Sequence, residues 1–108
     1  MASSTRRQPE IHRPTYRQLL VKLRRARETV GLTQPEVADL LVRSRSHISK
    51  CETGERRLGF IDVVEFAALY DKPLTYFAPS LADLLRETPG LRLELRQQER
   101  ASKPNKGQ

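Results

Sequence analysis

The segment from Thr33 to Gly54 limits the possible folds of this chain more than any other feature. Thr33 and Glu36 have the spacing of a capping box, in which a hydroxyl and a carboxylate satisfy the first free N–H groups of a helix. Ser44 can cap another helix, and Gly54 supplies the left-handed residue that often ends one. The apolar residues between these signals recur at helical spacing, namely Val37, Ala38, Leu40, Leu41, Ile48 and Cys51. We therefore predict two short helices joined by a tight turn, the second at about 45–53.

Similar signals predict a longer helix before this segment. Thr15 and Gln18 have the spacing of another capping box, and Gly31 would end the helix, which gives bounds of about 15–30. The residues expected on its buried face share the helical period and are Leu19, Leu23, Ala26 and Val30.

The C-terminal half predicts shorter elements. We expect a helix at about 61–72, a single turn at 75–77 and a helix at 81–87 that stops at the following Pro-Gly pair. Residues 91–100 alternate leucines as a strand does, yet their composition favours a helix, so we expect a helix there. The predicted fold class is therefore all-α, a bundle of four to five short helices with a C-terminal extension.

A chain of 108 residues has room for one compact domain. We expect a flexible basic arm at 1–13, one domain at 14–87, an extension at 88–100 and a disordered tail at 101–108. The two ends are rich in polar residues, proline and glycine and lack apolar periodicity.

The positive charge of the chain is concentrated in its first half. The net charge is +7, and residues 1–57 hold 13 basic and 6 acidic side chains, whereas residues 58–108 hold 7 of each. A one-sided basic field favours a polyanion as partner, because neutralised phosphates release their counterions. A plain soluble cationic surface is the alternative explanation.

The single cysteine, Cys51, cannot form a disulfide within the chain, which is typical of a reducing compartment. The first 30 residues contain no apolar run like that of a signal peptide, and no segment approaches the ~20 apolar residues of a membrane span. We expect a cytoplasmic protein that does not bind membranes.

The side chains of the segment around Thr33 to Gly54 indicate which kind of helical protein this is. GLTQPEVADLL followed by SRSHISKCETGERRL resembles the Xre-type, or phage-repressor, helix-turn-helix family, whose members include the lambda repressor-like regulators. The family pattern S-x-[IV]-S-K-x-E-x-G-E-R-R-L falls on Ser46 to Leu58, and the resemblance covers about residues 15–77. It implies a lambda repressor-like bundle, binding to double-stranded DNA as a homodimer and, usually, repression of transcription in bacteria or phages. A DNA-binding protein of this kind would be associated with the nucleoid. We also expect no cofactor and no small-molecule substrate.

The resemblance also implies roles for individual residues. The positions that read bases are Arg45, Ser46, Ser49 and Lys50, which at 100° per residue share an arc of about 140° on the second helix. Arg45 is the best candidate for base reading, because arginine can donate two hydrogen bonds to guanine. The positions that contact the DNA backbone are Gln34, Arg43, His47, Arg56 and Arg57. By the same resemblance Gln34 would also brace the recognition helix, and a plain capping role is the alternative.

Two structural contacts follow from the same resemblance. Arg27 would pair with Glu52, because a carboxylate at the inner edge of the second helix is costly without a partner. The homodimer would form through the helix at 81–87 and its extension, and the residues expected at this interface are Leu84, Leu91, Leu93 and Leu95.

Two residues depart from the family pattern. Val42 replaces the usual glycine after the first of the two short helices, where a β-branched residue is poorly suited to positive φ. Cys51 replaces an aromatic residue, which reduces the contact between neighbouring helices.

The alternatives to this interpretation are an enzyme, a metal-binding protein and a protein-binding module. An enzyme is disfavoured, because the chain has no paired carboxylates in an apolar setting and no glycine-rich phosphate loop. His47 and Cys51 share a helix face, but a structural zinc site needs four such ligands and only His12 remains, so we expect no metal. A protein-binding module on the same fold, such as an anti-activator or an antitoxin, remains the main alternative.

Overall fold

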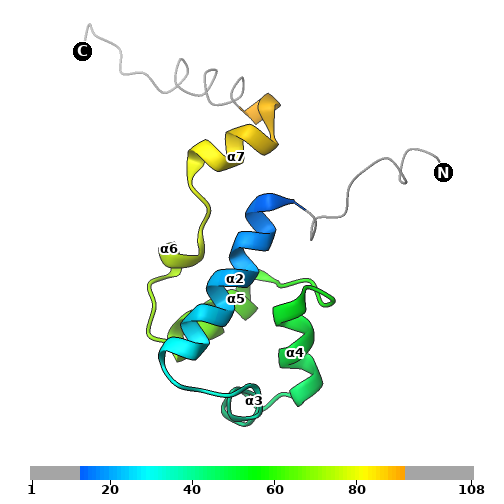
Figure 1. Ribbon diagram of the computed structural model, residues 1–108, viewed down its shortest axis with the longest axis vertical. Coiled ribbons are helices and arrows are strands. Elements are labelled where there is room, and N and C mark those ends of the chain that lie inside the picture. The colour runs from blue at the N-terminus through cyan, green and yellow to red at the C-terminus, as the bar shows by residue number, and fades with distance from the viewer. Residues whose placement is uncertain (1–12, 92–108) are drawn as a thin grey trace, which may run out of the picture.

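The computed structural model describes residues 13–91, and this part of the chain is built from helices without any strand. The helices are α2 (Pro14–Thr29), α3 (Gln34–Leu41), α4 (Arg45–Thr53), α5 (Phe60–Leu69), α6 (Leu74–Phe77) and α7 (Leu81–Glu87). Helices α2 to α5 group together, and the chain then passes through α6 to place α7 beside the start of α2 (Figure 1). The predicted all-α class is confirmed. Within the described residues no helix is both long and apolar enough to cross a bilayer.

Several sequence predictions lie outside this part of the chain. Of the predicted arm at 1–13 only Arg13 is described, and of the predicted extension at 88–100 only residues 88–91 are. Leu93, Leu95 and the tail at 101–108 lie outside the described residues.

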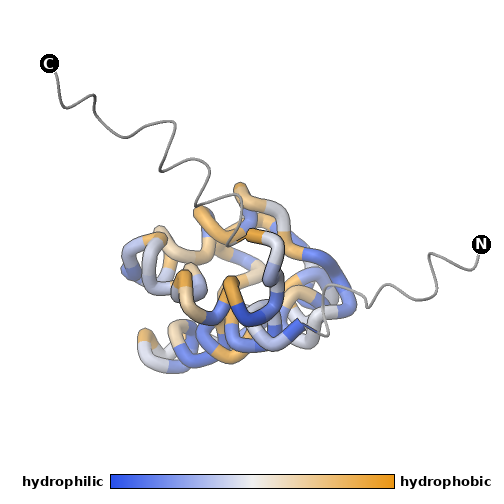
Figure 2. Tube along the Cα trace, turned by 90° about the horizontal axis from the view of Figure 1, so that it is seen from above, coloured by the Kyte–Doolittle hydropathy of each residue, from blue (hydrophilic) through white to orange (hydrophobic). Residues whose placement is uncertain are grey.

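The core lies where α2, α3, α4 and α5 meet. Its fully buried side chains come from all four helices and from α6, and they are Leu23, Ala26, Val37, Ala38, Ile48, Cys51, Phe66, Ala67, Tyr70 and Phe77. Hydrophobic and hydrophilic segments alternate along the trace (Figure 2), as expected of helices that bury one face. Each short helix is therefore held by packing against the others, because helices of this length are marginal by themselves.

Most of the predicted helix ends are present. The Thr33 hydroxyl accepts a hydrogen bond from the Glu36 N–H, and the Glu36 carboxylate accepts one from the Thr33 N–H. The Ser80 hydroxyl caps α7 by accepting a single hydrogen bond from the Asp83 N–H. Gly31, with φ of 78°, follows α2 in the left-handed region.

The sequence-based prediction was wrong about the start of α2 and about the burial of Val30. The N-cap of α2 is Arg13, and the helix begins at Pro14, so Thr15 is its second residue and not its cap. Val30 is 41% exposed, because it lies at the end of the helix, beyond the packed face.

The capping group of α2 comes instead from α7. The Glu87 carboxylate accepts hydrogen bonds from the Thr15 N–H and from the Thr15 hydroxyl, the latter at 2.7 Å. The Arg13 Nε also donates to Glu87 at 3.0 Å, and a second Arg13 nitrogen donates to the Thr88 hydroxyl. Arg13 is therefore tied to α7, whereas the sequence placed it in a flexible arm.

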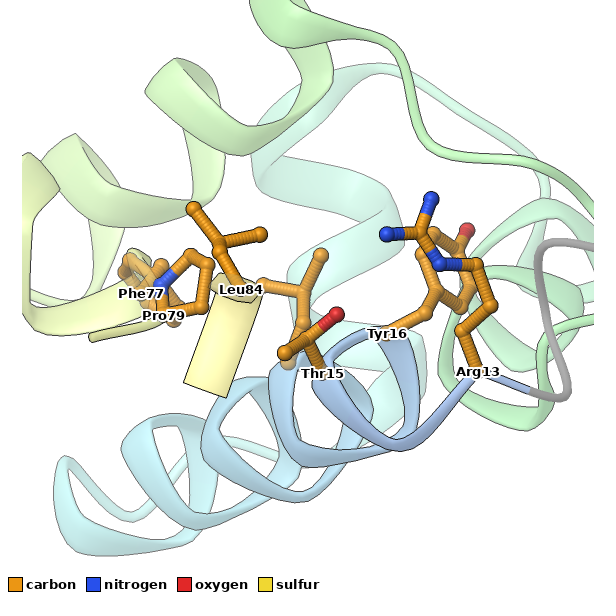
Figure 3. Close-up of a pocket in the computed structure, with 7 residues that line it drawn as sticks. Arg13, Thr15, Tyr16, Phe77, Pro79 and Leu84 are labelled. Carbon is orange, nitrogen blue, oxygen red and sulfur yellow. The ribbon is translucent and has the colours of Figure 1, made fainter. Parts of the chain in front are cut away.

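Apolar packing at this junction is incomplete. A cavity of about 200 Å³ remains between the start of α2 and the segment that leads into α7, and α7 has no fully buried residue. Leu84 lines this cavity between Phe77 and Pro79 on one side and Thr15 and Tyr16 on the other (Figure 3). The attachment of α7 therefore depends strongly on Glu87.

The environment of Glu87 makes this attachment sensitive to pH. Desolvation pushes the pKa of the Glu87 carboxyl up, but the hydrogen bonds from Thr15 and Arg13 outweigh it and hold the pKa below its ordinary value. A carboxyl with a lowered pKa in the folded chain stabilises the fold above its unfolded pKa of about 4.3. That contribution is lost as the pH falls through the folded value.

We expect Glu87→Gln to lower the melting temperature at about pH 7, because a neutral amide cannot replace the charged acceptor of Arg13 and Thr15. The difference from the wild type should shrink as the pH falls below about 4, where the wild-type carboxyl is itself protonated. Thermal melts across this pH range test the prediction. Glu55→Gln, at an exposed position, is the control, and equal melting of Glu87→Gln and wild type at neutral pH would contradict it.

Candidate nucleic-acid interface

Helices α3 and α4 form a helix-turn-helix with a three-residue connection, Val42 to Ser44. At the end of α3, the Val42 N–H donates to the Asp39 carbonyl and the Arg43 N–H donates to the Ala38 carbonyl at 2.8 Å. This pair of bonds is a Schellman motif, which requires a left-handed residue. Val42 occupies that conformation, with φ of 56° and ψ of 52°. The turn therefore keeps the backbone shape that a glycine would favour, at the cost of strain.

Helix α4 begins and ends where the sequence predicted. The Ser44 hydroxyl accepts a hydrogen bond from the His47 N–H at 3.0 Å, which caps the first turn. Gly54, with φ of 91°, ends the helix, and its N–H donates to the Lys50 carbonyl. Both ends of α4 are thus fixed by local hydrogen bonds.

The two sides of α4 differ in burial. Ile48 and Cys51 are fully buried in the core. The opposite side carries the four predicted base-reading residues, of which Arg45, Ser46 and Lys50 are exposed and Ser49 is half-buried. The fold therefore presents these side chains together on the outer face of α4.

A buried carboxylate fixes α4 against the two preceding helices. Glu52, whose side chain is 4% exposed, accepts hydrogen bonds from the Arg27 Nε at 2.6 Å and from another Arg27 nitrogen at 3.1 Å. The predicted Arg27–Glu52 ion pair is present. Arg27 also donates to the Leu32 carbonyl at 2.9 Å, which ties the loop after α2 to the same site. The hydrogen bond to Glu52 is the main reason that the pKa of Arg27 is raised.

Gln34 belongs to this cluster. Its side-chain N–H donates to Glu52 at 2.9 Å, so the first residue of α3 is joined to the last turn of α4. The sequence analysis expected Gln34 to brace the recognition helix and also to reach a phosphate. The observed bond agrees with the bracing role, while the phosphate contact remains a prediction.

The predicted backbone-contacting residues border the outer face of α4. Arg43, Arg56 and Arg57 are exposed. The Arg43 guanidinium lies 3.7 Å from the Glu65 carboxylate of α5, an ion pair that sequence reasoning missed because the two residues belong to elements far apart in the chain. Exposed pairs of this kind are weak, so Arg43 can exchange Glu65 for another anion.

His47 is half-buried beside this border. Desolvation lowers its pKa, and the positive charges of Arg56 and Arg43 lower it further, against a smaller opposing effect of Asp62 and Glu65. The imidazole is therefore neutral at pH 7.

The thiol of Cys51 points into the core. Burial raises the pKa of Cys51, so the thiol stays protonated. Within residues 13–91 no group of three or more His, Cys, Asp or Glu side chains is placed to hold a metal ion.

The link from α4 to α5 is held by residues that sequence reasoning did not single out. The Tyr16 hydroxyl accepts a hydrogen bond from the Leu58 N–H at 3.0 Å. The Asp62 carboxylate accepts one from the Gly59 N–H at 2.8 Å, at the start of α5. The second contact had a visible signal, since a carboxylate three residues after an N-cap is half of a capping box. The contact of Tyr16 had none, because it joins residues 42 positions apart.

Comparison with known proteins agrees with this geometry. Residues 18–74, more than half of the chain, match a family model described as a helix-turn-helix domain. The chain therefore belongs to the helix-turn-helix domain family. Searches of curated proteins and of solved structures gave no match. Membership in this family indicates DNA binding, because the second helix of the motif is the one that enters the major groove.

We expect Arg27→Met to lower the free energy of unfolding by about 3–5 kcal/mol, because it leaves the nearly buried Glu52 carboxylate without its cation. The double variant Arg27→Met/Glu52→Leu should recover much of this loss, since no buried charge is then left unpaired. Urea denaturation of both variants measures the difference. If the double variant were no more stable than Arg27→Met, the unpaired Glu52 carboxylate would not be the cause of the lost stability.

We expect Val42→Gly to raise the free energy of unfolding by about 1 kcal/mol. A left-handed conformation costs a residue with a Cβ about 1–2 kcal/mol, which exceeds the entropy that glycine loses on folding. Val42 is 87% exposed, so little packing is lost. Asp71, also left-handed with φ of 56°, is the matched control. Asp71→Gly should stabilise less, because aspartate tolerates this region better than valine, and no gain for Val42→Gly in urea denaturation would disprove strain at the turn.

Proposed function

We propose that this protein is a sequence-specific transcriptional regulator that places α4 in the major groove of double-stranded DNA. The observation that supports this most is the outer face of α4, where Arg45, Ser46 and Lys50 are exposed together. The inner face of the same helix is fixed by the core and by Glu52. A groove-reading helix needs this combination of free polar side chains and a rigid backbone.

The side chains of this face suit different parts of DNA. Arg45 is the first residue of α4, and a guanidinium can donate two hydrogen bonds to O6 and N7 of guanine. Ser46 and Ser49 are short and can bond to base edges of either kind. Lys50 lies nearer the end of the helix, where an ammonium group fits a phosphate.

The border of the face supports a phosphate-binding role. Arg43, Arg56 and Arg57 come just before and just after α4, and Gln34 and His47 are half-buried. Contacts of these residues with the DNA backbone would fix the position of α4 without reading sequence. The concentration of positive charge in residues 1–57 favours the same partner.

We further propose that the regulator is a repressor that binds a palindromic operator as a homodimer. One short recognition helix reads only a few base pairs, and two copies related by a two-fold axis read half-sites about one helical turn apart. A protein that occupies such a site can block transcription by its position alone. The resemblance to phage repressors favours this role.

We expect Arg45→Ala to weaken binding to the preferred DNA sequence by about 1–3 kcal/mol and to relax the preference at one base pair. The preferred sequence is first obtained by selection from random DNA, and gel-shift titrations then compare it with singly altered sequences.

Arg56→Ala is the matched control, because a backbone contact should weaken binding to all sequences equally and lower the salt slope by about one unit. Uniform weakening by Arg45→Ala would refute its base-reading role. The absence of any salt-sensitive, sequence-dependent shift for the wild type would refute DNA recognition and favour a protein-binding module.

A further inference from the structure

Helix α5 has an exposed face that is entirely apolar. Phe60 is 68% exposed, Ile61 is 64% exposed and Val64 is 37% exposed, and Ala68 is also exposed. At 100° per residue these four side chains fall within an arc of about 100°. They form one patch, which we call the α5 face.

The charges of α5 do not interrupt this patch. Its two acidic residues, Asp62 and Glu65, lie on the neighbouring edge of the helix, where Asp62 caps Gly59 and Glu65 pairs with Arg43. The third side of the helix holds Phe66, Ala67 and Tyr70 in the core. A surface helix of a soluble domain normally turns a polar side to water, so the α5 face has the composition of a contact surface.

We propose that the α5 face is the surface through which two copies of this chain pair. The proposal rests on the proposed function, since it supplies the second recognition helix that an operator of two half-sites requires.

The charge distribution favours a second copy as the occupant. Two copies of a chain with net charge +7 repel each other over most of their surfaces, and the α5 face carries no charge. A two-fold contact also needs a patch that is complementary to itself, and an apolar patch without charges brings no like charges together. The border of the α5 face carries charges of both signs, because Glu65 on the edge of α5 lies next to Arg43. In a two-fold pair these charges can also meet their opposites on the other copy.

The α5 face is poorly suited to DNA. It has no cation to neutralise a phosphate, and its edge carries the Asp62 and Glu65 carboxylates.

The position of the face connects it rigidly to the recognition helix. Only five residues separate the end of α4 at Thr53 from the N-cap of α5 at Gly59. This link is fixed by the bond from the Leu58 N–H to the Tyr16 hydroxyl. A pair formed through α5 therefore sets the spacing and orientation of the two α4 helices.

The surface that the sequence predicted for the dimer is less suitable. Leu84 of α7 lines the cavity beside Phe77 and Pro79, so its side chain is partly used within one copy (Figure 3). Leu91 is half-buried. A substitution at Leu84 therefore serves as the competing variant in the test below.

The test measures the mass of the full chain without DNA, by sedimentation equilibrium over a series of concentrations. The wild type should show a reversible pair with twice the 12.4 kDa mass of the chain. Ile61→Lys should weaken the pair by about 30-fold or more, because it places two like charges in an apolar contact. The matched control is Val21→Lys on α2, where valine is 49% exposed but lies on another helix. It should leave the pair intact.

A second measurement tests the two-fold geometry. Ile61→Glu alone should weaken the pair as Ile61→Lys does, whereas an equal mixture of Ile61→Lys and Ile61→Glu should recover a heterodimer, because opposite charges then face each other. Circular dichroism of each variant monitors folding, and recovery in the mixture itself shows that both variants are folded.

Three results would overturn the proposal. A monomeric wild type at every concentration would assign the α5 face to another segment of the chain or to a different protein. A pair that survives Ile61→Lys, but not Leu84→Lys, would assign the dimer to α7. Failure of the mixture to pair would exclude a two-fold contact at Ile61. Because no DNA is present, these outcomes are independent of whether α4 reads a sequence.

Discussion

The Glu52 carboxylate is shared by the Arg27 guanidinium and the Gln34 amide, and the other parts of the site depend on this arrangement. A carboxylate with so little exposure is stable only while its partners remain in place. Those partners lie in α2 and at the start of α3, and Arg27 also holds the Leu32 carbonyl. One buried charge therefore fixes the angle of α4 against two other helices, which leaves the opposite side of α4 free for recognition.

The local strain of the structure lies at the turn beside this cluster. Val42 adopts a left-handed conformation because the Schellman bonds at the end of α3 require it. The core residues on either side of the turn, Ala38 and Ile48, hold the two helices in place. Packing thus supplies the free energy that the strained residue costs, which is common near functional sites. At the other end of the domain, α7 has little such packing and depends on Glu87.

The outer surfaces of α4 and α5 have opposite character, which suits the proposed DNA-binding dimer. The face of α4 is polar and basic, whereas the face of α5 is apolar and without charge. The link between them is short and fixed to Tyr16. In the proposed dimer, this link would set the distance between the two α4 helices without a conformational change.

The sequence by itself determined the helices and most of their ends, because capping boxes, left-handed glycines and apolar periodicity act within a few residues. Thr33, Ser44 and Gly54 placed α3 and α4 correctly, and the match to the family pattern identified the Arg27–Glu52 pair. It misjudged Thr15, because the group that caps α2 is Glu87, 72 residues away. Only the tertiary structure decided that contact, the bond from Gln34 to Glu52 and the exposure of the α5 face. Contacts between distant segments leave no local pattern, since they depend on how the helices pack.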